Sequence, residues 1–385
     1  MTYRVAIIGT GPDPETQDRD GYAMAYRHAA GYQRLDSCSL VACADIVPEN
    51  AEAFADHHGL TAVYEDHESM LEDVEPDIVS VCVPPAIHAD LVVDCATTAS
   101  VDAVHCEKPM ATTWGDCQRM VETCDAEDVQ LTIDHQRRLS EPVQRAKKLL
   151  KNGEIGDLKR LEWSEVNLFD AGSHLFDLCD YFVGGARAEW ALAGIDCSHE
   201  NRWFGALNET RAIARWQYAD GTIGFASTAE DGDTVVDAYL RIVGEDGVIE
   251  IHPESGPVLR IRTDGGWEAI DTDESVYGPT PGLVHRGLNK VTSLIPRIPS
   301  PAQPPTHYEQ AIDHLVSSLQ SGTEPLFSGR RVLRGTELVF ASWESARRRG
   351  RVHLPLDIEG NPLEEMYEAG QLAGIAEREE PAPAE

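Results

Sequence analysis

A glycine turn near the start of the chain could hold a phosphate group. Gly9-Thr10-Gly11 directly follows an apolar run at residues 4–8. Glycines after a first strand let the backbone turn tightly and bring its N–H groups to a pyrophosphate, although an ordinary strand-to-helix turn could use the same residues. An insertion at residues 12–20 contains four acids, so it must point away from a bound pyrophosphate or cover it from the side. We expect Gly9, Thr10 and Gly11 to contact a dinucleotide.

Two further positions follow the next apolar runs. Asp45 ends the second run, where a carboxylate can accept hydrogen bonds from a ribose diol and repel a 2′-phosphate. This favours NAD without excluding NADP, and Asp45 could equally cap the helix that begins at Pro48. Pro84, with His88 just beyond it, ends the third run. This rigid proline segment could lie against the cofactor, or it could simply connect a strand to a helix.

Residue types suited to proton transfer occur further along the chain. Glu107-Lys108-Pro109 follows the fourth run, at the sheet edge where such folds bind ligands. Asp170 and His174 are four residues apart, so on one helix they would share a face. Histidine has the side-chain pKa nearest neutrality, which suits a general base. Taken alone, the segment also fits Asp170 as a helix N-cap and His174 as a satisfied structural histidine.

The order of these motifs resembles that of one dehydrogenase family. The motifs are Val83-Pro84-x-x-x-His88, Glu107-Lys108-Pro109, Gln136-Arg137-Arg138 and Asp170-x-x-x-His174, and residues 324–329 and 345–355 look like the family's ending. The chain is therefore similar, over residues 4–356, to the glucose–fructose oxidoreductase, inositol dehydrogenase and rhizopine-catabolism (Gfo/Idh/MocA) oxidoreductases. The Glu-Lys-Pro tripeptide is the most specific element of the resemblance.

The resemblance implies hydride transfer between a secondary alcohol of a sugar, inositol or related polyol and NAD(P). It implies that Lys108 bonds the reacting hydroxyl, that His174 is the general acid/base and that Asp170 orients or assists it. Glu107 and Lys108 are also expected at the cofactor. Arg137 could contact cofactor or substrate, or form a salt bridge at a helix start. A non-catalytic NAD(P)-binding sensor, and a lyase or glycosidase that recycles NAD, remain alternatives, and retention of Lys108 and His174 speaks against the sensor.

Two features depart from the family pattern. One is the insertion at residues 12–20, and the other is the short link between Trp163 and Asp170. Family members usually carry a longer loop there that helps to wall the substrate site. We expect a more open pocket here, or one filled by another segment such as the proline-rich residues 278–305.

Strand and helix patterns divide the chain. Apolar runs at 4–8, 40–44, 78–83, 101–106 and 129–133 alternate with helices predicted at 22–30, 48–59, 86–99 and 113–125. Continuous apolar runs separated by helices indicate a doubly wound parallel sheet, so residues 1–135 are predicted to form a Rossmann domain in an α/β fold.

The second half changes pattern. Beyond helices at 141–152 and 172–183, runs at 158–167, 188–197, 210–218, 222–229, 238–243, 248–251 and 258–261 are joined by turns. They predict a large open, mostly antiparallel sheet. With helices at 307–322 and 331–350, residues 136–356 form a predicted α+β domain for catalysis and oligomerisation, followed by an acidic, partly disordered tail at 357–385.

Composition restricts the partners. The 385 residues include 66 Asp+Glu against 32 Lys+Arg, a net charge of −34, which argues against nucleic acid and anionic membranes as partners. The acids are spread along the chain and only six of the basic residues are Lys, which favours a halophilic cytoplasm. We expect a cytoplasmic homo-oligomer, a dimer or tetramer, with a small-molecule substrate. The nine Cys include no C-x-x-C pair, so buried thiols and no metal site are predicted.

Overall fold

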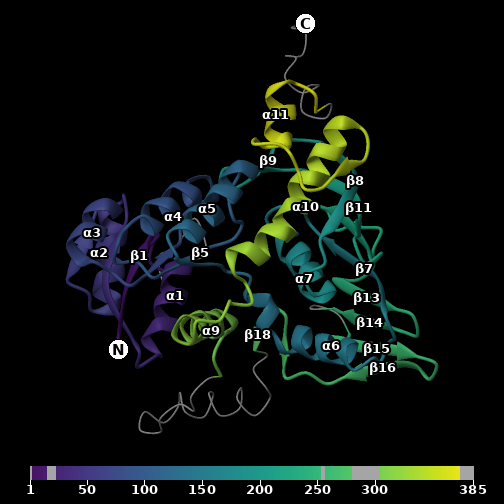
Figure 1. Ribbon diagram of the computed structural model, residues 1–385, viewed down its shortest axis with the longest axis horizontal. Coiled ribbons are helices and arrows are strands. Elements are labelled where there is room, and N and C mark those ends of the chain that lie inside the picture. Colours follow the sequence, from purple (N-terminus) through teal and green to yellow (C-terminus); the bar gives the residue numbers. More distant parts are fainter. Residues whose placement is uncertain (1, 15–22, 253–255, 280–303, 373–385) are drawn as a thin grey trace, which may run out of the picture.

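Continuous apolar strands build the amino-terminal sheet. The computed structural model describes residues 2–14, 23–252, 256–279 and 304–372. In that part of the chain, a parallel sheet has the order β3-β2-β1-β4-β5-β6 (Figure 1). The strands are β1 (Tyr3–Ile8), β2 (Cys38–Ala44), β3 (Ala62–Tyr64), β4 (Ile78–Val81), β5 (Ala103–Cys106) and β6 (Gln130–Ile133). The predicted Rossmann domain is confirmed, and its strand order reverses between β1 and β4, where such folds bind ligands.

Helices cover both faces of this sheet. They are α1 (Met24–Gln33), α2 (Pro48–His58), α3 (His67–Val74), α4 (His88–Ala96) and α5 (Trp114–Ala126). The predicted helix at 86–99 is instead a short 3-10 turn, η1 (Pro85–Ile87), followed by α4. Sequence patterns missed β3 and α3, because a strand of only three residues shows too little periodicity to be recognised.

The second domain is a nine-stranded sheet in the described chain, with the order β16-β15-β14-β13-β7-β12-β11-β8-β19. Its strands are β7 (Leu158–Glu165), β8 (Ala188–Asp196), β11 (Arg211–Tyr218), β12 (Ile223–Ala229), β13 (Leu240–Gly244), β14 (Val248–Ile251), β15 (Leu259–Thr263), β16 (Gly266–Ile270) and β19 (Val352–His353). Only β12 and β7 pair in parallel. The prediction of a large, mostly antiparallel sheet is therefore confirmed.

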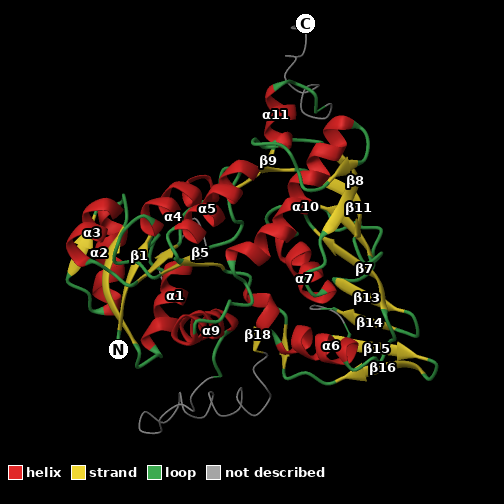
Figure 2. Ribbon diagram, viewed as in Figure 1, coloured by secondary structure: helices red, strands yellow, loops and turns green. Residues whose placement is uncertain are grey.

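Helices cover one face of that sheet. Figure 2 shows α7 (Ser173–Val183) and α10 (Gly329–Arg348) on the side toward the amino-terminal domain, with α6 (Glu141–Lys151) near β15. Two short hairpins complete the described strands: β9 (Asn201–Trp203) with β10 (Ala206–Asn208), and β17 (Glu274–Ser275) with β18 (Gly278–Pro279). The opposite face of the sheet exposes apolar side chains, including Leu192 and Ile213.

Helix α9 (His307–Ser321) crosses back to the first domain. A capping box between Thr306 and Glu309 starts it, and Ile312 joins the core beneath β1. A Cβ on Gly31 of α1 would lie 2.8 Å from Cγ1 of Ile312, so glycine permits this close helix packing. A segment predicted within residues 136–356 thus packs on the Rossmann domain. Most of the proline-rich crossing segment before it lies outside the described residues.

The first part of the predicted tail is folded. Helix α11 (Pro362–Glu368) is capped by the Asn361 side chain, and Leu363 and Met366 are buried. Residues 373–385 lie outside the described chain. All nine cysteines are free thiols, and seven of them are buried. The described chain contains no helix with the length and apolar character needed to cross a membrane.

A buried ion pair joins the start of the second domain to helix α7. In the short turn η2 (Gln136–Leu139), Arg138 donates from Nε to Asp177 Oδ2 at 2.7 Å and from Nη2 to Asp177 Oδ1 at 2.7 Å. Its Nη1 also donates to the Leu326 carbonyl at 2.7 Å. Because these groups are withdrawn from water, removing Asp177 leaves the buried charge of Arg138 with only one longer carboxylate contact, to Asp180 at 3.3 Å.

Replacing Asp177 with Ala should therefore lower the free energy of unfolding by about 3–5 kcal/mol. The exposed Arg211–Asp231 pair supplies the control, since Asp231→Ala should cost less than about 1 kcal/mol. Denaturant midpoints of both variants measure the difference. Equal midpoints would contradict the role assigned to Arg138.

Candidate active site

A cavity of about 540 Å³ lies between the two domains, at the carboxyl edge of the parallel sheet. Both domains contribute to its wall. The predicted site residues that line it are Thr10, Gly11, Pro84, Glu107, Lys108, Arg137, Asp170 and His174. Its size is in the range of cofactor and small-molecule sites.

The glycine turn at one end of the cavity is built for close backbone packing. Gly9 has φ +82°, and a Cβ there would lie 2.3 Å from Cγ1 of Val83. Asp45 braces the turn, because its Oδ2 accepts hydrogen bonds from the Gly11 N–H and the Thr10 hydroxyl, each at 3.0 Å. Neither Gly9 nor Asp45 is among the described residues that line the cavity. Gly9 thus shapes the turn, and Asp45, whose Oδ1 also accepts from the Val47 N–H at 2.9 Å, keeps one lone pair on Oδ1 for a further donor.

Lys108 and Asp170 meet across the cavity from different domains. Lys108 Nζ donates to Asp170 Oδ1 at 2.9 Å and to the Asp170 carbonyl at 3.2 Å. Asp170 lies in a turn before α7, which begins at Ser173, so the prediction that Asp170 and His174 share one helix face is wrong. A Cβ on Gly172 would lie 2.5 Å from the Asn167 carbonyl oxygen, which explains the tight turn. The carboxylate holds Lys108 and does not cap the helix.

His174 lies in the first turn of α7 and is buried. Its pKa lies well below 6.5, first because of burial and then because Arg137, His135 and Lys108 add positive charge nearby. The imidazole is therefore neutral near pH 7. Its Nδ1 is 3.3 Å from Nδ1 of His135, whereas Nε2 makes no hydrogen bond to the described residues. When Nδ1 donates to His135, Nε2 carries the lone pair that a general base needs.

His135 is a site residue that sequence reasoning missed. It follows β6 at the carboxyl edge of the sheet, directly before Gln136-Arg137-Arg138. Burial chiefly lowers its pKa to about 4, so this ring is also neutral. In the sequence, only the position of His135 just after a strand indicated that it could belong to the site. Its contact with His174 sets which ring nitrogen of His174 is free.

Arg137 gives one wall of the cavity a positive charge. Its Nη1 donates to the Tyr239 hydroxyl at 2.6 Å and lies 3.7 Å from Glu165 Oε1. The guanidinium also lies 5.0 Å from the centre of the Tyr277 ring. Arg137 therefore forms a salt bridge and lines the cavity, and its contact with cofactor or substrate stays a prediction.

Side chains that flank the proline-rich segment also form the wall. Val276, Tyr277, His307 and Tyr308 line the cavity together with Phe204 from the turn between β9 and β10. Residues 280–303, and residues 15–22, which include most of the acidic insertion at 12–20, lie outside the described chain.

The structure corrects the prediction that His88 contacts the cofactor. His88 is completely buried, with Nδ1 2.9 Å from the Pro109 carbonyl and Nε2 2.8 Å from the Val83 carbonyl. Both ring nitrogens thus face backbone carbonyls, to one of which a neutral ring can donate, and the ring is not among the described residues that line the cavity. His88 ties the turn after β4 to the turn that carries Lys108.

Arg27 of α1 is a second residue that sequence reasoning missed. It lines the cavity beside Thr10 and Gly11, and its guanidinium lies 4.9 Å from the centre of the Tyr308 ring. It forms no ion pair with the described residues. A cation beside the glycine turn suits the charge of a pyrophosphate.

Replacing Arg27 with Gln should weaken NADH binding about 10- to 100-fold, because hydrogen bonds to charged groups contribute roughly 1.5–3 kcal/mol. NADH fluorescence titration measures the dissociation constant. Arg119→Gln, an exposed arginine of the same domain, is the control. Unchanged affinity in the Arg27 variant would show that this cation does not reach the cofactor.

Comparison with known proteins gives two matches to family models. Residues 3–135 match the model described as "Oxidoreductase family, NAD-binding Rossmann fold", and residues 147–354 match "Oxidoreductase family, C-terminal alpha/beta domain". Together the two matches span most of the chain and cover both domains described above.

Individual relatives agree with these matches. Myo-inositol 2-dehydrogenase of Thermotoga maritima is 30% identical over 262 residues, which is 64% of this chain and 74% of the relative. D-apiose dehydrogenase of Rhizobium rhizogenes is 26% identical over 84% of this chain and 92% of the relative. The solved structure of levoglucosan dehydrogenase in complex with NADH superimposes with a TM-score of 0.72 at 17% identity, covering 93% of this chain and all of that one, and so shares the fold.

Proposed function

Because the chain belongs to the Gfo/Idh/MocA oxidoreductase family, whose amino-terminal domain is an NAD-binding Rossmann fold, we propose that it transfers hydride between a secondary alcohol of a sugar, inositol or related polyol and NAD. One observation carries the proposal. Lys108 is held by Asp170 in the cavity that His174 and the glycine turn also line.

The residues around the glycine turn fit NAD. A Cβ at Gly9 would collide with Val83, so glycine is needed to form this turn, and the backbone of the turn at Thr10 and Gly11 lines the cavity where a pyrophosphate would lie, with the positive charge of Arg27 beside it. The Asp45 carboxylate would accept from a ribose diol and repel a 2′-phosphate. When bound, NAD supplies the hydride acceptor.

Side chains of the protein then accept the hydroxyl proton and stabilise the charge on the oxygen. His174 Nε2 accepts this proton as the carbon–hydrogen bond gives up its hydride, and the alcohol becomes a carbonyl. The Lys108 ammonium stabilises the negative charge that develops on the oxygen. Asp170 keeps the ammonium in place, and Arg137 and Tyr277 offer polar contacts to the other hydroxyl groups.

The exposed face of the large sheet supports the expected homo-oligomer. Leu192 and Ile213 lie on the face that α7 and α10 leave uncovered, and each is 44% or more exposed. Burying such a patch in a second copy would remove apolar surface from water. Light scattering would measure the number of copies.

A substrate screen tests the proposed reaction. Sugars, inositols and sugar acids are offered with NAD at low and at molar KCl, and NADH absorbance is followed. The expected result is NADH release in proportion to the carbonyl product with at least one polyol. NADH binding without turnover would favour the sensor alternative. Product formation without net NADH would favour a lyase that recycles the cofactor.

The pH dependence follows from the lowered pKa of His174. The free ring is unprotonated at pH 6.5, where an ordinary histidine would be half protonated. The charged and titratable groups that face it are Arg137, Lys108 and His135. We expect kcat/KM for alcohol oxidation to stay level as the pH falls through 6.5 and to drop only at more acidic pH. A profile of initial rates measures this, and an acidic limb at or above pH 6.5 would contradict it.

A further inference from the structure

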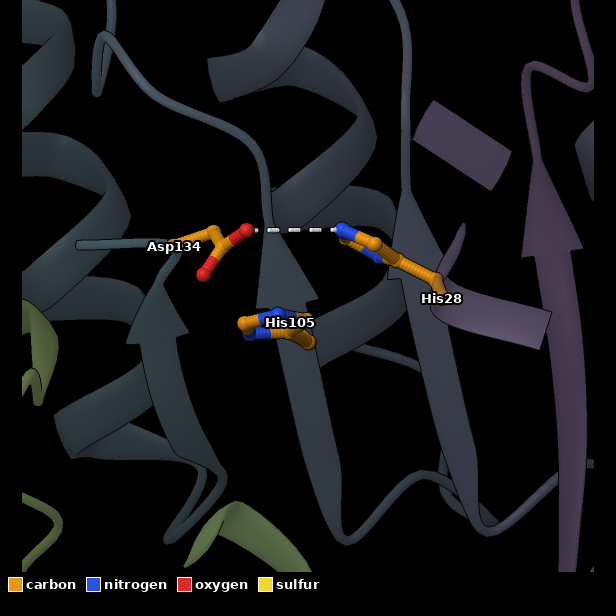
Figure 3. A group of neighbouring side chains, drawn as sticks. All are labelled: His28, His105 and Asp134. Atoms are coloured by element: carbon orange, nitrogen blue, oxygen red, sulfur yellow. Dashed lines mark ion pairs between the residues drawn. The ribbon is translucent and has the colours of Figure 1, made fainter. Parts of the chain in front are cut away.

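A buried cluster of ligand-type side chains lies behind the cavity wall. His28 comes from α1, His105 from β5 and Asp134 from the end of β6 (Figure 3). All three are at most 1% exposed, and one ligand atom from each lies within 4.8 Å of the others. The proposed reaction uses none of these side chains, so their convergence needs its own explanation.

Asp134 lacks the partners that a buried carboxylate requires. Neither of its oxygens has a hydrogen-bond partner among the described residues, and the nearest cationic nitrogen, His28 Nε2, is 3.7 Å from Oδ2. Buried polar groups are almost always satisfied, so two free carboxylate oxygens point to a missing proton, water or cation. Burial indeed raises the pKa of Asp134 to about 6.

His105 presents a free lone pair in the same region. Its Nδ1 lies 2.8 Å from Thr132 Oγ1, and that hydroxyl is placed to donate to the Val104 carbonyl at 3.4 Å. Oγ1 therefore accepts from His105 Nδ1–H, which leaves Nε2 unprotonated. This Nε2 is buried and has no partner among the described residues. Burial keeps the ring neutral by lowering its pKa well below 6.5.

His28 also has an outer partner, but the nitrogen that faces the cluster is not free. Its Nδ1 lies 3.3 Å from both Ser80 Oγ and Cys82 Sγ, and its Nε2 lies 3.0 Å from Glu107 Oε1, which accepts a hydrogen bond from this nitrogen in the absence of an ion. Metal-binding histidines usually fix one ring nitrogen with an outer hydrogen bond and offer the other to the ion. Both histidines of the cluster have such an outer partner.

We propose that His28, His105 and Asp134 bind a divalent ion of the zinc class. Zinc bonds of about 2.0–2.1 Å in a tetrahedron separate neighbouring ligand atoms by about 3.4 Å. The distance from His28 Nε2 to Asp134 Oδ2, 3.7 Å, is close to this value. Glu107 Oε1 lies 3.0 Å from the same nitrogen, so its carboxylate adds a second negative charge beside the ion. Although burial lowers the pKa of His28, the nearby Cys82, Asp134 and Glu107 raise it well above 6.5, so the ion would displace a proton from this ring.

The ion would link elements that are distant in sequence. It joins α1, β5 and β6, and through Glu107 it adjoins the peptide that carries Lys108. It is a structural and positioning site, because substrate does not reach residues this deeply buried. A second group in the described chain, His67, Glu68 and Asp94, is more exposed, and its His67–Asp94 pair is already satisfied at 2.9 Å. That group carries no inference and serves as a control.

Metal retention tests the proposal on the full chain. Purified protein is stripped with a chelator, loaded with Zn²⁺ or with Co²⁺ as a spectroscopic probe, and passed through gel filtration before metal analysis. We expect one ion per chain, with the visible spectrum of four-coordinate Co²⁺. His105→Leu should retain none, and Asp134→Asn should bind at least 10- to 100-fold more weakly.

Asp94→Asn is the matched control and should still retain one ion per chain. Zn²⁺ should also raise the melting temperature of the parent protein but not that of His105→Leu. If the parent retains no ion, the cluster holds a proton or water and the proposal fails. It also fails if His105→Leu and Asp134→Asn bind as tightly as the parent, or if Asp94→Asn abolishes binding.

Discussion

Replacing His174 with Asn is expected to lower kcat for alcohol oxidation by about 10²–10⁴-fold, the usual contribution of a general base. The ring is neutral, its Nδ1 is held by His135 and its Nε2 makes no hydrogen bond to the described residues. Asn preserves a polar contact to His135 but cannot accept a proton near neutral pH. The KM for NAD should change little, because His174 does not belong to the glycine turn.

Initial rates with a substrate from the screen measure this loss. His199→Asn provides the matched control, since His199 is an exposed histidine of the same domain that pairs with Glu230. A residual rate within a few-fold of the parent would remove His174 from the mechanism. The pH profile distinguishes the two roles of the ring, because a structural histidine would leave the shape of the profile unchanged.

Replacing Lys108 with Met is expected to lower kcat by about 10²–10³-fold, similar to the loss of one donor from an oxyanion site. Met keeps most of the length of the side chain and removes the ammonium. The cavity then lacks the charge that stabilises the developing alkoxide, and Asp170 loses its partner at 2.9 Å. The effect should appear mainly in kcat, since the alkoxide charge develops only in the transition state.

A surface lysine controls for the loss of charge. Lys159→Met removes an exposed ammonium that pairs with Glu245 and should leave kcat unchanged. A double variant, Lys108→Met with Asp170→Asn, tests whether Asp170 acts through Lys108. If it does, the double variant loses no more than Lys108→Met alone. Additive losses would give Asp170 a separate role, and normal turnover in Lys108→Met would reject the assignment.

The two sheets could be predicted because their strands have distinct patterns. Runs such as residues 78–83 are apolar except for Ser80, as is typical of strands covered on both faces. β11 alternates exposed and buried residues, as a strand with one free face does. The return of α9 to the first domain could not be predicted, because the amphipathic pattern of a helix shows that one face is buried but not against which partner.

The candidate site was predictable where a residue type and a strand end coincide. Lys108 and His174 line the cavity as expected. His88 has a reactive side chain at a suitable position, but its ring nitrogens lie within hydrogen-bond distance of the Val83 and Pro109 carbonyls. Arg27 and His135 were missed, since an arginine in a helix or a histidine after a strand has no distinctive local pattern.

The amino-acid sequence by itself determined the order of most strands and helices and the glycine turn, because these features depend on local periodicity and on residues close together in the chain. The joint role of Lys108 and His174 was implied by the resemblance of the motifs to one family. Only the tertiary structure decided that Asp170 holds Lys108, that His135 orients His174, and that His28, His105 and Asp134 converge. Each of these contacts joins separate elements, and their separation in space depends on how whole sheets and helices pack.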